Sequence, residues 1–305
     1  MENLFTMPKK ILVLGSLFFF FSCAQDEMIN NDLQNNASLS FTAKMSADKL
    51  NVFKGPKVAI GNDSARSWIS VRKDTGLPHE IGIEMTPGAL TGLPDNDPGV
   101  ESPTIVLPLH LKAKQLTPFK HIGLNWQNHG HGGGPTNTEF NSPHFDFHFY
   151  TISNEERLAI PDWCSCPADA AFNIYPPTTM TTTSPPITIT TGGYMPLGYA
   201  TPPGQGAVYG QMGKHWLPIP FNYLPFTKVM VYGTYNGKIV FVEPMVSLDY
   251  LLSNNLEPRD NPYSQPLKFE KAGNYPTKYN IYRDAKTGNT KITLSDFLPR
   301  EATPN

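Results

Sequence analysis

The chain has 305 residues, a formal net charge of −2 and only 16% charged residues, together with 30 prolines and 24 glycines. The small net charge and the absence of a basic run argue against nucleic acid as a partner. Because prolines and glycines interrupt helices repeatedly, the composition favours short strands joined by many turns, in one large domain or two small ones.

The first 22 residues have the pattern of a secretory signal peptide. Two lysines precede an apolar run at residues 11–21, which is too short to span a bilayer, and Ser22 and Cys23 follow the run. A cysteine at this place resembles the lipobox of bacterial lipoproteins, although Phe20 replaces the usual leucine. We therefore predict a lipid on Cys23 that anchors the protein in a membrane, in the periplasm or at the cell surface. Plain secretion after cleavage is the alternative.

Residues 23–50 are rich in Asn, Asp, Gln and Ser and have few large apolar side chains, so they cannot bury enough surface to fold. We expect a flexible tether there, and one β-rich domain over residues 51–305. Short apolar alternations in residues 52–85 predict one or two edge strands, and residues 86–102 have turn chemistry throughout.

Two alternating stretches predict strands ahead of the region that is rich in histidine. In residues 104–112, four apolar side chains ending with Leu111 fall on one face, and Pro108 favours an edge strand or a bulged one. Residues 120–126 repeat the alternation and lead directly into the histidines.

Residues 129–150 contain four of the chain's eight histidines. If residues 143–150 (P-H-F-D-F-H-F-Y) form a strand, its period of two places three phenylalanines on one face and polar groups on the other. The polar face then carries His144, Asp146, His148 and Tyr150. Imidazole, carboxylate and phenol are the groups that a metal site or an acid/base site needs.

Strand geometry limits which of these groups can share an ion. Residues i and i+2 lie about 6.6–7 Å apart along a strand, and residues i and i+4 roughly 13 Å apart. Asp146 can therefore share an ion with either strand histidine, whereas both histidines can do so only if the strand bends. The remaining ligands must come from elsewhere, and we expect His215 and Glu243. An unpaired carboxylate on the apolar face of the Glu243 strand would be costly.

Other groups are expected beside the ligands rather than among them. The glycine-rich loop H-G-H-G-G-G places His129 and His131 on the rim of the site, and we expect Tyr150, Met212 and Met245 on the rim or directly behind the ligands. Three histidines and a carboxylate suit zinc, copper, manganese or iron, and the residues do not choose among these metals. An open coordination position would let the metal activate water or bind a small substrate.

Two other interpretations of the same residues stay open. They can form a buried hydrogen-bonded network that only fixes the fold, or a metal-free acid/base site. In the first case the protein is a non-enzymatic structural or binding module, with loop tyrosines that contact a glycan or a partner protein: Tyr194, Tyr199, Tyr209 and Tyr223. No nucleophile elbow, P-loop or dinucleotide fingerprint is present, so no enzyme class is assigned.

The rest of the chain predicts helices, loops and hairpins. Ser153 and Glu156 form a capping box for a short helix. Residues 161–204 predict an extended loop, in which Cys164 and Cys166 form a small disulfide, bind metal or stay as thiols. Asn236-Gly237 predicts a hairpin between residues 228–235 and 238–243, and a terminal hairpin is expected over residues 279–295.

The order of motifs G-L-N-W, H-G-H, P-H-F-D-F-H-F-Y, M-G-K-H-W and F-V-E-P-M resembles the TTHB-like family of domains of unknown function, over residues 107–252. The resemblance implies a shared β-rich fold and a shared polar constellation rather than a reaction. We predict a mainly β fold, a single antiparallel β-barrel or β-sandwich with long Pro/Gly-rich loops and one or two short helices; a homo-oligomer is compatible with it. The residues that carry the family's motifs are His129, His131, His144, Asp146, His148, Met212, His215, Glu243 and Met245.

Overall fold

The computed structural model describes residues 49–97, 100, 102–131, 140–177, 179–181, 187–221 and 223–303. The expected signal peptide (1–22), Cys23 and all but the last two residues of the expected tether lie outside the described residues. Lys49–Asn305 forms one compact unit. No helix in the described part of the chain is both long and apolar enough to cross a membrane.

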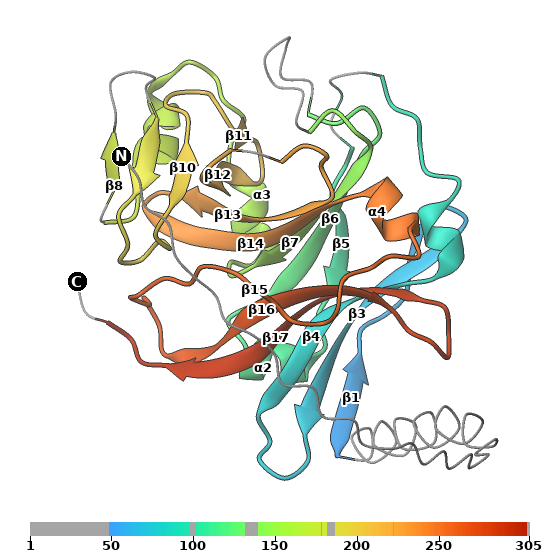
Figure 1. Ribbon diagram of the computed structural model, residues 1–305. Coiled ribbons are helices and arrows are strands. Elements are labelled where there is room, and N and C mark those ends of the chain that lie inside the picture. Colours follow the sequence, from blue (N-terminus) through green and yellow to red (C-terminus); the bar gives the residue numbers. More distant parts are fainter. Residues whose placement is uncertain are drawn as a thin grey trace, which may run out of the picture. The chain divides into compact units, whose positions relative to one another are not determined.

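The unit is a sandwich of two antiparallel sheets, and neither sheet closes into a barrel (Figure 1). The mainly β prediction and its sandwich alternative are therefore confirmed, and the barrel alternative is wrong. The first sheet has the order β1-β3-β4-β17-β16-β15, with β2 paired to β3. Its strands are β1 (Leu50–Lys54), β2 (Val58–Ile60), β3 (Asp63–Arg72), β4 (Pro78–Met85), β15 (Asn261–Pro262), β16 (Gly273–Arg283) and β17 (Thr290–Arg300).

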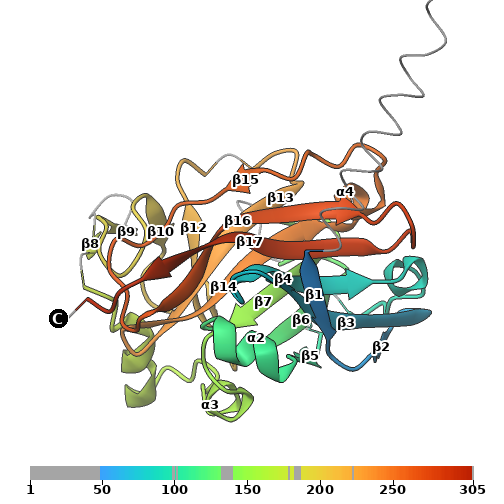
Figure 2. The ribbon, with the colours of Figure 1, turned by 90° about the horizontal axis from the view of Figure 1, so that it is seen from below.

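The second sheet has the order β5-β6-β7-β14-β13-β12-β10-β9-β8, with β11 paired to β12. Seen from below, β16 and β17 of the first sheet lie in front of β14 and β7 of the second (Figure 2). The strands of the second sheet are β5 (Ile105–Pro108), β6 (His121–Gln127), β7 (His144–Tyr150), β8 (Thr179–Thr181), β9 (Thr188–Thr190), β10 (Tyr199–Thr201), β11 (Val208–Tyr209), β12 (Gly213–Pro218), β13 (Lys228–Tyr235) and β14 (Lys238–Ser247).

Helices are short and lie between the strands. The α-helices of the described residues are α2 (Leu111–Leu116), α3 (Asn154–Leu158) and α4 (Leu248–Leu252), and the 3₁₀ helices are η1 (Pro87–Leu90) and η2 (Pro167–Asn173). The predicted capping box is confirmed at α3: the Ser153 hydroxyl accepts from the backbone N–H of Glu156, and the Glu156 carboxylate accepts from the backbone N–H of Ser153.

The core lies between the sheets, and the alternation in β7 decides which side chains enter it. Phe145, Phe147 and Phe149 are fully buried there against apolar side chains of the first sheet such as Ile81 and Ile83. The polar residues of β7 must therefore point away from the core, towards the outer face of the second sheet.

The predicted strand at residues 104–112 is too long. β5 ends at Pro108, and α2 begins after His110, whose Nδ1 accepts a hydrogen bond from the backbone N–H of Lys112 at 3.1 Å. Leu111 consequently lies on the helix and is 64% exposed. The hydrogen bond from Lys112 to the His110 ring begins a helix at a point where the apolar alternation predicts a continuing strand. The alternation gives no sign of this cap, because histidine is not among the usual capping residues.

The prediction of one or two edge strands in residues 52–85 is also wrong, because four strands form and β3 and β4 lie inside the first sheet. Trp68–Val71 is buried on both faces, so alternation is hidden there. Similarly, the terminal hairpin is longer than the predicted residues 279–295, since β16 begins at Gly273 and β17 ends at Arg300.

The central hairpin is confirmed: β13 and β14 turn at Asn236-Gly237, where both residues have positive φ. The segment 161–204 is more regular than predicted, because it contains η2, β8, β9 and β10. Within it, Cys164 and Cys166 form a disulfide.

Candidate metal centre

The outer face of the second sheet carries the polar residues of β7 between two small apolar clusters. One cluster contains Phe140, Phe226 and Met245, and the other contains Tyr150 and Phe241. His144 and His148 are 0% exposed and Asp146 is 2% exposed, although they lie on the outer side of the sheet. The outer face of the sheet is therefore covered at these positions, and it forms a second buried region that contains polar side chains.

Strand pairing places a second carboxylate beside β7. Val242 of β14 pairs with Phe149, and the next pair is Met245 with Asp146, so the pairing is interrupted at Glu243 and Pro244. Proline has no N–H to give to a neighbouring strand, which accounts for an interruption at this point. Glu243 is only 1% exposed, and it lies beside His148.

The first group of candidate ligands consists of His148, His215 and Glu243. The Nε2 atoms of His148 and His215 lie 3.6 and 3.7 Å from the same carboxylate oxygen, Oε2 of Glu243. The three residues come from β7, β12 and β14, and His215 pairs with Gly233 of β13 across the sheet. The ring of Phe241 occupies the space where a Cβ at position 233 would be, 2.0 Å from the nearest ring atom. A glycine is therefore required there.

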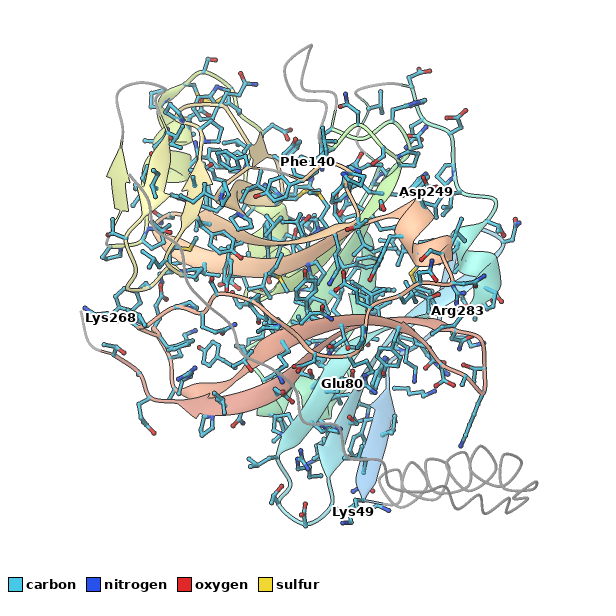
Figure 3. The ribbon with its side chains drawn as sticks, viewed as in Figure 1. Lys49, Glu80, Phe140, Asp249, Lys268 and Arg283 are labelled. Atoms are coloured by element: carbon cyan, nitrogen blue, oxygen red, sulfur yellow. A yellow bond between two sulfur atoms is a disulfide. The ribbon has the colours of Figure 1, made fainter. Side chains whose placement is uncertain are left out.

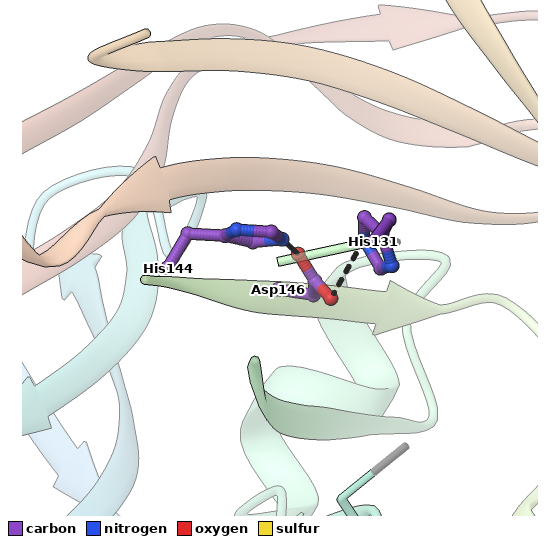
Figure 4. Close-up of side chains that lie close together, drawn as sticks. All are labelled: His131, His144 and Asp146. Atoms are coloured by element: carbon purple, nitrogen blue, oxygen red, sulfur yellow. Dashed lines mark ion pairs between the residues drawn. The ribbon is translucent and has the colours of Figure 1, made fainter. Parts of the chain in front are cut away.

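The second group consists of His131, His144 and Asp146 (Figure 4). Nε2 of His131 lies 3.5 Å from Oδ2 of Asp146, and Nε2 of His144 lies 3.4 Å from Oδ1. Asp146 thus lies between two imidazoles, each facing a different oxygen. His131 was expected on the rim of the site, but it approaches the carboxylate as closely as His144 does.

The two groups adjoin one another. Asp146 and His148 are two residues apart on the same face of β7, which corresponds to about 6.6–7 Å along a strand. The ring of Tyr209 lies between the groups, with its centroid 5.3 Å from that of His131 and 5.0 Å from that of His215. The single site that we expected from His144, His148, His215 and Glu243 is therefore divided in two. His144 contacts Asp146, whereas His148 contacts Glu243.

The four Nε2-to-oxygen distances can be compared with those of hydrogen bonds and of metal ligands. Hydrogen bonds from nitrogen to oxygen are roughly 2.7–3.2 Å long. A tetrahedral site with bonds of roughly 2.0–2.1 Å has about 3.4 Å between neighbouring ligand atoms. The four distances of 3.4–3.7 Å lie close to the second value.

Hydrogen bonds at Nδ1 fix the orientation of two imidazoles. Nδ1 of His144 lies 2.7 Å from the carbonyl oxygen of Ser142, and Nδ1 of His215 lies 3.3 Å from that of Ala207. A carbonyl only accepts, so in each neutral ring Nδ1 carries the proton and the Nε2 lone pair faces a carboxylate oxygen. Two acceptors that face each other repel, and either a proton on Nε2 or a metal ion between them removes this repulsion.

His148 is neutral near pH 7, because burial lowers the pKa of its imidazole to about 3. Neither of its ring nitrogens makes a hydrogen bond to another described residue, although the side chain is 0% exposed. A buried imidazole without hydrogen bonds is costly. Burial would raise the pKa of Asp146, but the positive charges that His144 and His131 carry when protonated, together with a hydrogen bond from His131, outweigh burial and hold that pKa below its usual value.

The residues expected on the rim differ in their positions. His129 lies apart from both groups, 44% exposed, with Nε2 3.3 Å from Oδ1 of Asp95. Tyr150 is buried and stacks on His148, with 5.5 Å between the ring centroids. Met212 packs in the cluster of Tyr150, and Met245 pairs with Asp146 across the strands.

The sequence does not show that Tyr209 lies between the two groups or that His131 contacts Asp146. Both belong to loops or a two-residue strand, where no periodicity shows which way a side chain points. The spacing H-x-H was the only available signal for His131. A third group, Cys164, Cys166 and Asp169, also has ligand spacing, but its cysteines are joined and Asp169 accepts the backbone N–H groups of both.

Residues 74–126 match a family model. The family is TTHB210-like, described as "Hypothetical protein TTHB210". This match supports the family resemblance, and it runs from the turn before β4 into β6. The motifs of β7, β12 and β14 that suggested the resemblance lie beyond residue 126. Neither the curated proteins nor the solved structures contain a match to this chain.

Proposed function

We propose that this protein binds first-row transition metal ions at the outer face of its second sheet, in two adjoining sites. His148, His215 and Glu243 form the first, and His131, His144 and Asp146 form the second. The observation that carries the proposal is that each buried carboxylate lies beside two imidazoles, with Nε2-to-oxygen distances of 3.4–3.7 Å, close to the spacing of neighbouring ligands on one metal ion.

Each site would have two imidazoles and one carboxylate. Structural zinc sites usually have four protein ligands, whereas three protein ligands leave a position for water or a substrate. Two imidazoles and a carboxylate also suit iron(II), manganese and copper. His131 and His215 are the most exposed members, with 18% and 13% of their side chains accessible, so a small molecule would approach beside Tyr209. The proposal is thus of a reactive or ligand-binding centre rather than a purely structural one.

We further propose that the protein is lipid-anchored through Cys23 in the bacterial envelope. The apolar run, the small residue before Cys23 and the polar segment after it support this proposal. A disulfide between Cys164 and Cys166 fits an oxidising compartment.

Elemental analysis of the purified protein tests metal binding. We expect close to two equivalents of metal per chain, and we expect thermal stabilisation when zinc, copper, manganese or iron(II) is added to metal-depleted protein, because a ligand that binds only the folded state stabilises it. The absence of both effects would reject the proposal and favour the alternative in which the same residues only stabilise the fold.

A further inference from the structure

A cavity at the other side of the second sheet has a lining that suits a ligand of different chemistry. Its volume is about 490 Å³, within the range of roughly 300–1,000 Å³ that is usual for small-molecule sites. It lies between the sheets, at the end of the sandwich where β6, β14 and β16 begin. Lys268, one of its lining residues, is labelled at that end in Figure 3.

The lining combines an apolar floor with a cationic rim. The floor includes Phe119, Tyr232 and Val242, all at most 8% exposed. Five exposed lysines stand around the opening, whereas only two carboxylates line it, Glu156 and Glu270. This excess of positive charge contrasts with the net charge of −2 for the whole chain. The five lysines are Lys114, Lys120, Lys238, Lys268 and Lys271.

The rim lysines are not used in ion pairs within the described part of the chain. The lysine and arginine ion pairs there involve other residues, namely Lys54, Arg66, Lys228, Arg259, Lys278 and Lys291. Of the two carboxylates, Glu156 already accepts the backbone N–H of Ser153 at 2.7 Å. The charges of Lys271 and Lys120 act on Glu156, and five lysines against two carboxylates still leave an excess of three positive charges at the opening for an anion.

Neutral polar side chains of the lining, in contrast, are already hydrogen-bonded. The hydroxyls of Tyr232 and Tyr263 donate to the carbonyls of Ser264 and Pro276 at 2.9 and 2.8 Å. Asn274 donates to the carbonyl of Leu116 at 3.0 Å. A neutral sugar would consequently find few partners, whereas an apolar body with an anionic head would match both floor and rim.

We propose that this cavity binds a small amphipathic anion, with its apolar body on the floor and its anionic head at the lysines. A medium-chain carboxylate is the simplest member of this class. Binding needs neither candidate metal site, because none of the six candidate ligands lines the cavity.

Isothermal titration of the full chain with decanoate, below its micellar concentration, tests the proposal. We expect saturable binding of one equivalent of decanoate and no binding of decyltrimethylammonium. Hexanoate should bind at least about tenfold more weakly than decanoate, because each buried methylene contributes roughly 0.8 kcal/mol. Lys120→Gln with Lys271→Gln should weaken decanoate binding about tenfold, and Lys57→Gln, outside the cavity, should leave it unchanged.

Two outcomes would overturn the proposal. One is equal binding of decanoate and decyltrimethylammonium, which would show a merely apolar surface. The other is sedimentation of the protein with vesicles of anionic phospholipid in the absence of any decanoate binding, which would make the lysines a membrane-facing patch. Circular dichroism of each lysine variant excludes unfolding as the cause of lost binding.

Discussion

Nε2 of His148 lies 3.6 Å from Oε2 of Glu243, and neither residue is more than 1% exposed. His148 comes from β7, whose alternation is visible in the sequence, and Glu243 comes from β14, whose pairing with β7 is interrupted at Glu243 and Pro244. The pair is too far apart for a hydrogen bond and too deeply buried for water to screen it freely. Its arrangement suits a shared cation.

Glu243→Gln separates the metal interpretation from the structural one. The amide lacks the charge for a metal but can donate to a neutral imidazole. We expect the metal content to fall from two equivalents to about one, while the metal-free variant melts at the same temperature as the metal-free parent or higher. A large loss of stability without any change in metal content would instead support a structural network. Glu155→Gln, on the exposed side of α3, is the matched control.

His131→Gln and His129→Gln form a second matched pair, because the two histidines share one loop but only His131 faces Asp146. We expect His131→Gln to lower metal affinity at the second site at least about tenfold, and His129→Gln to leave it unchanged. Metal titration of the depleted proteins measures both. Equal effects of the two substitutions would show that the loop acts as a whole and that His131 is not a ligand.

Gly233→Ala tests how the sheet makes room for the first site. Its Cβ would meet the Phe241 ring at 2.0 Å, and the same ring contacts His215 with 5.0 Å between centroids. We expect a loss of about 1–3 kcal/mol in the free energy of unfolding, as for other overpacked positions, together with weaker metal binding at the first site only. Chemical denaturation and metal titration measure the two effects. Unchanged binding would show that Phe241 does not hold His215 in position.

Acid should destabilise the metal-free protein through buried neutral histidines. Burial, with a smaller contribution from Arg157, lowers the pKa of His121 to about 4 from an unfolded value of 6.5. Below pH 6.5 the unfolded chain therefore binds more protons than the folded one. The stabilising contribution of neutral His121 to the free energy of unfolding is fully present above pH 6.5 and decreases as the pH falls towards 4. His121→Phe should reduce the slope of the free energy of unfolding against pH, between pH 6.5 and 4, by at most about 1.4 kcal/mol per pH unit. Denaturant unfolding at several pH values measures it, and an unchanged slope would contradict the assignment.

Cys23→Ser tests the lipid anchor. The thiol is the group that a lipobox presents for lipidation, so we expect the parent protein in the membrane or detergent phase and the serine variant in the aqueous phase. Phase partition with metabolic labelling by a fatty acid measures both. A parent protein that is cleaved and remains unlabelled would show plain secretion.

Much of the fold could be predicted where one strand face is polar and the other apolar. The bounds of β6, β7 and the β13–β14 hairpin came close to the structure because alternation and Asn236-Gly237 mark them directly. β3 and β4 could not be predicted as interior strands, since burial on both faces removes the period of two. The helix α2 was missed because its N-terminus is capped by His110, a residue outside the usual capping set.

The candidate site was partly accessible to the same reasoning. Strand geometry showed that His144 and His148 cannot both reach one ion from a straight strand, and the structure places them at different carboxylates. Strand geometry does not predict that two groups of three ligands form, because His131 lies outside the strands and no periodicity shows where its side chain points. The contact between His131 and Asp146 joins residues that no pattern in the sequence relates to each other.

Anomalous X-ray diffraction from crystals of the metal-loaded protein, collected on both sides of the absorption edge of the metal, tests the central claim most directly. We predict two anomalous peaks per chain, each roughly 2.0–2.2 Å from its ligands: one at Nε2 of His148 and His215 with the Glu243 carboxylate, and one at Nε2 of His131 and His144 with the Asp146 carboxylate. Full metal occupancy elsewhere, with no peak at either triad, would contradict the account.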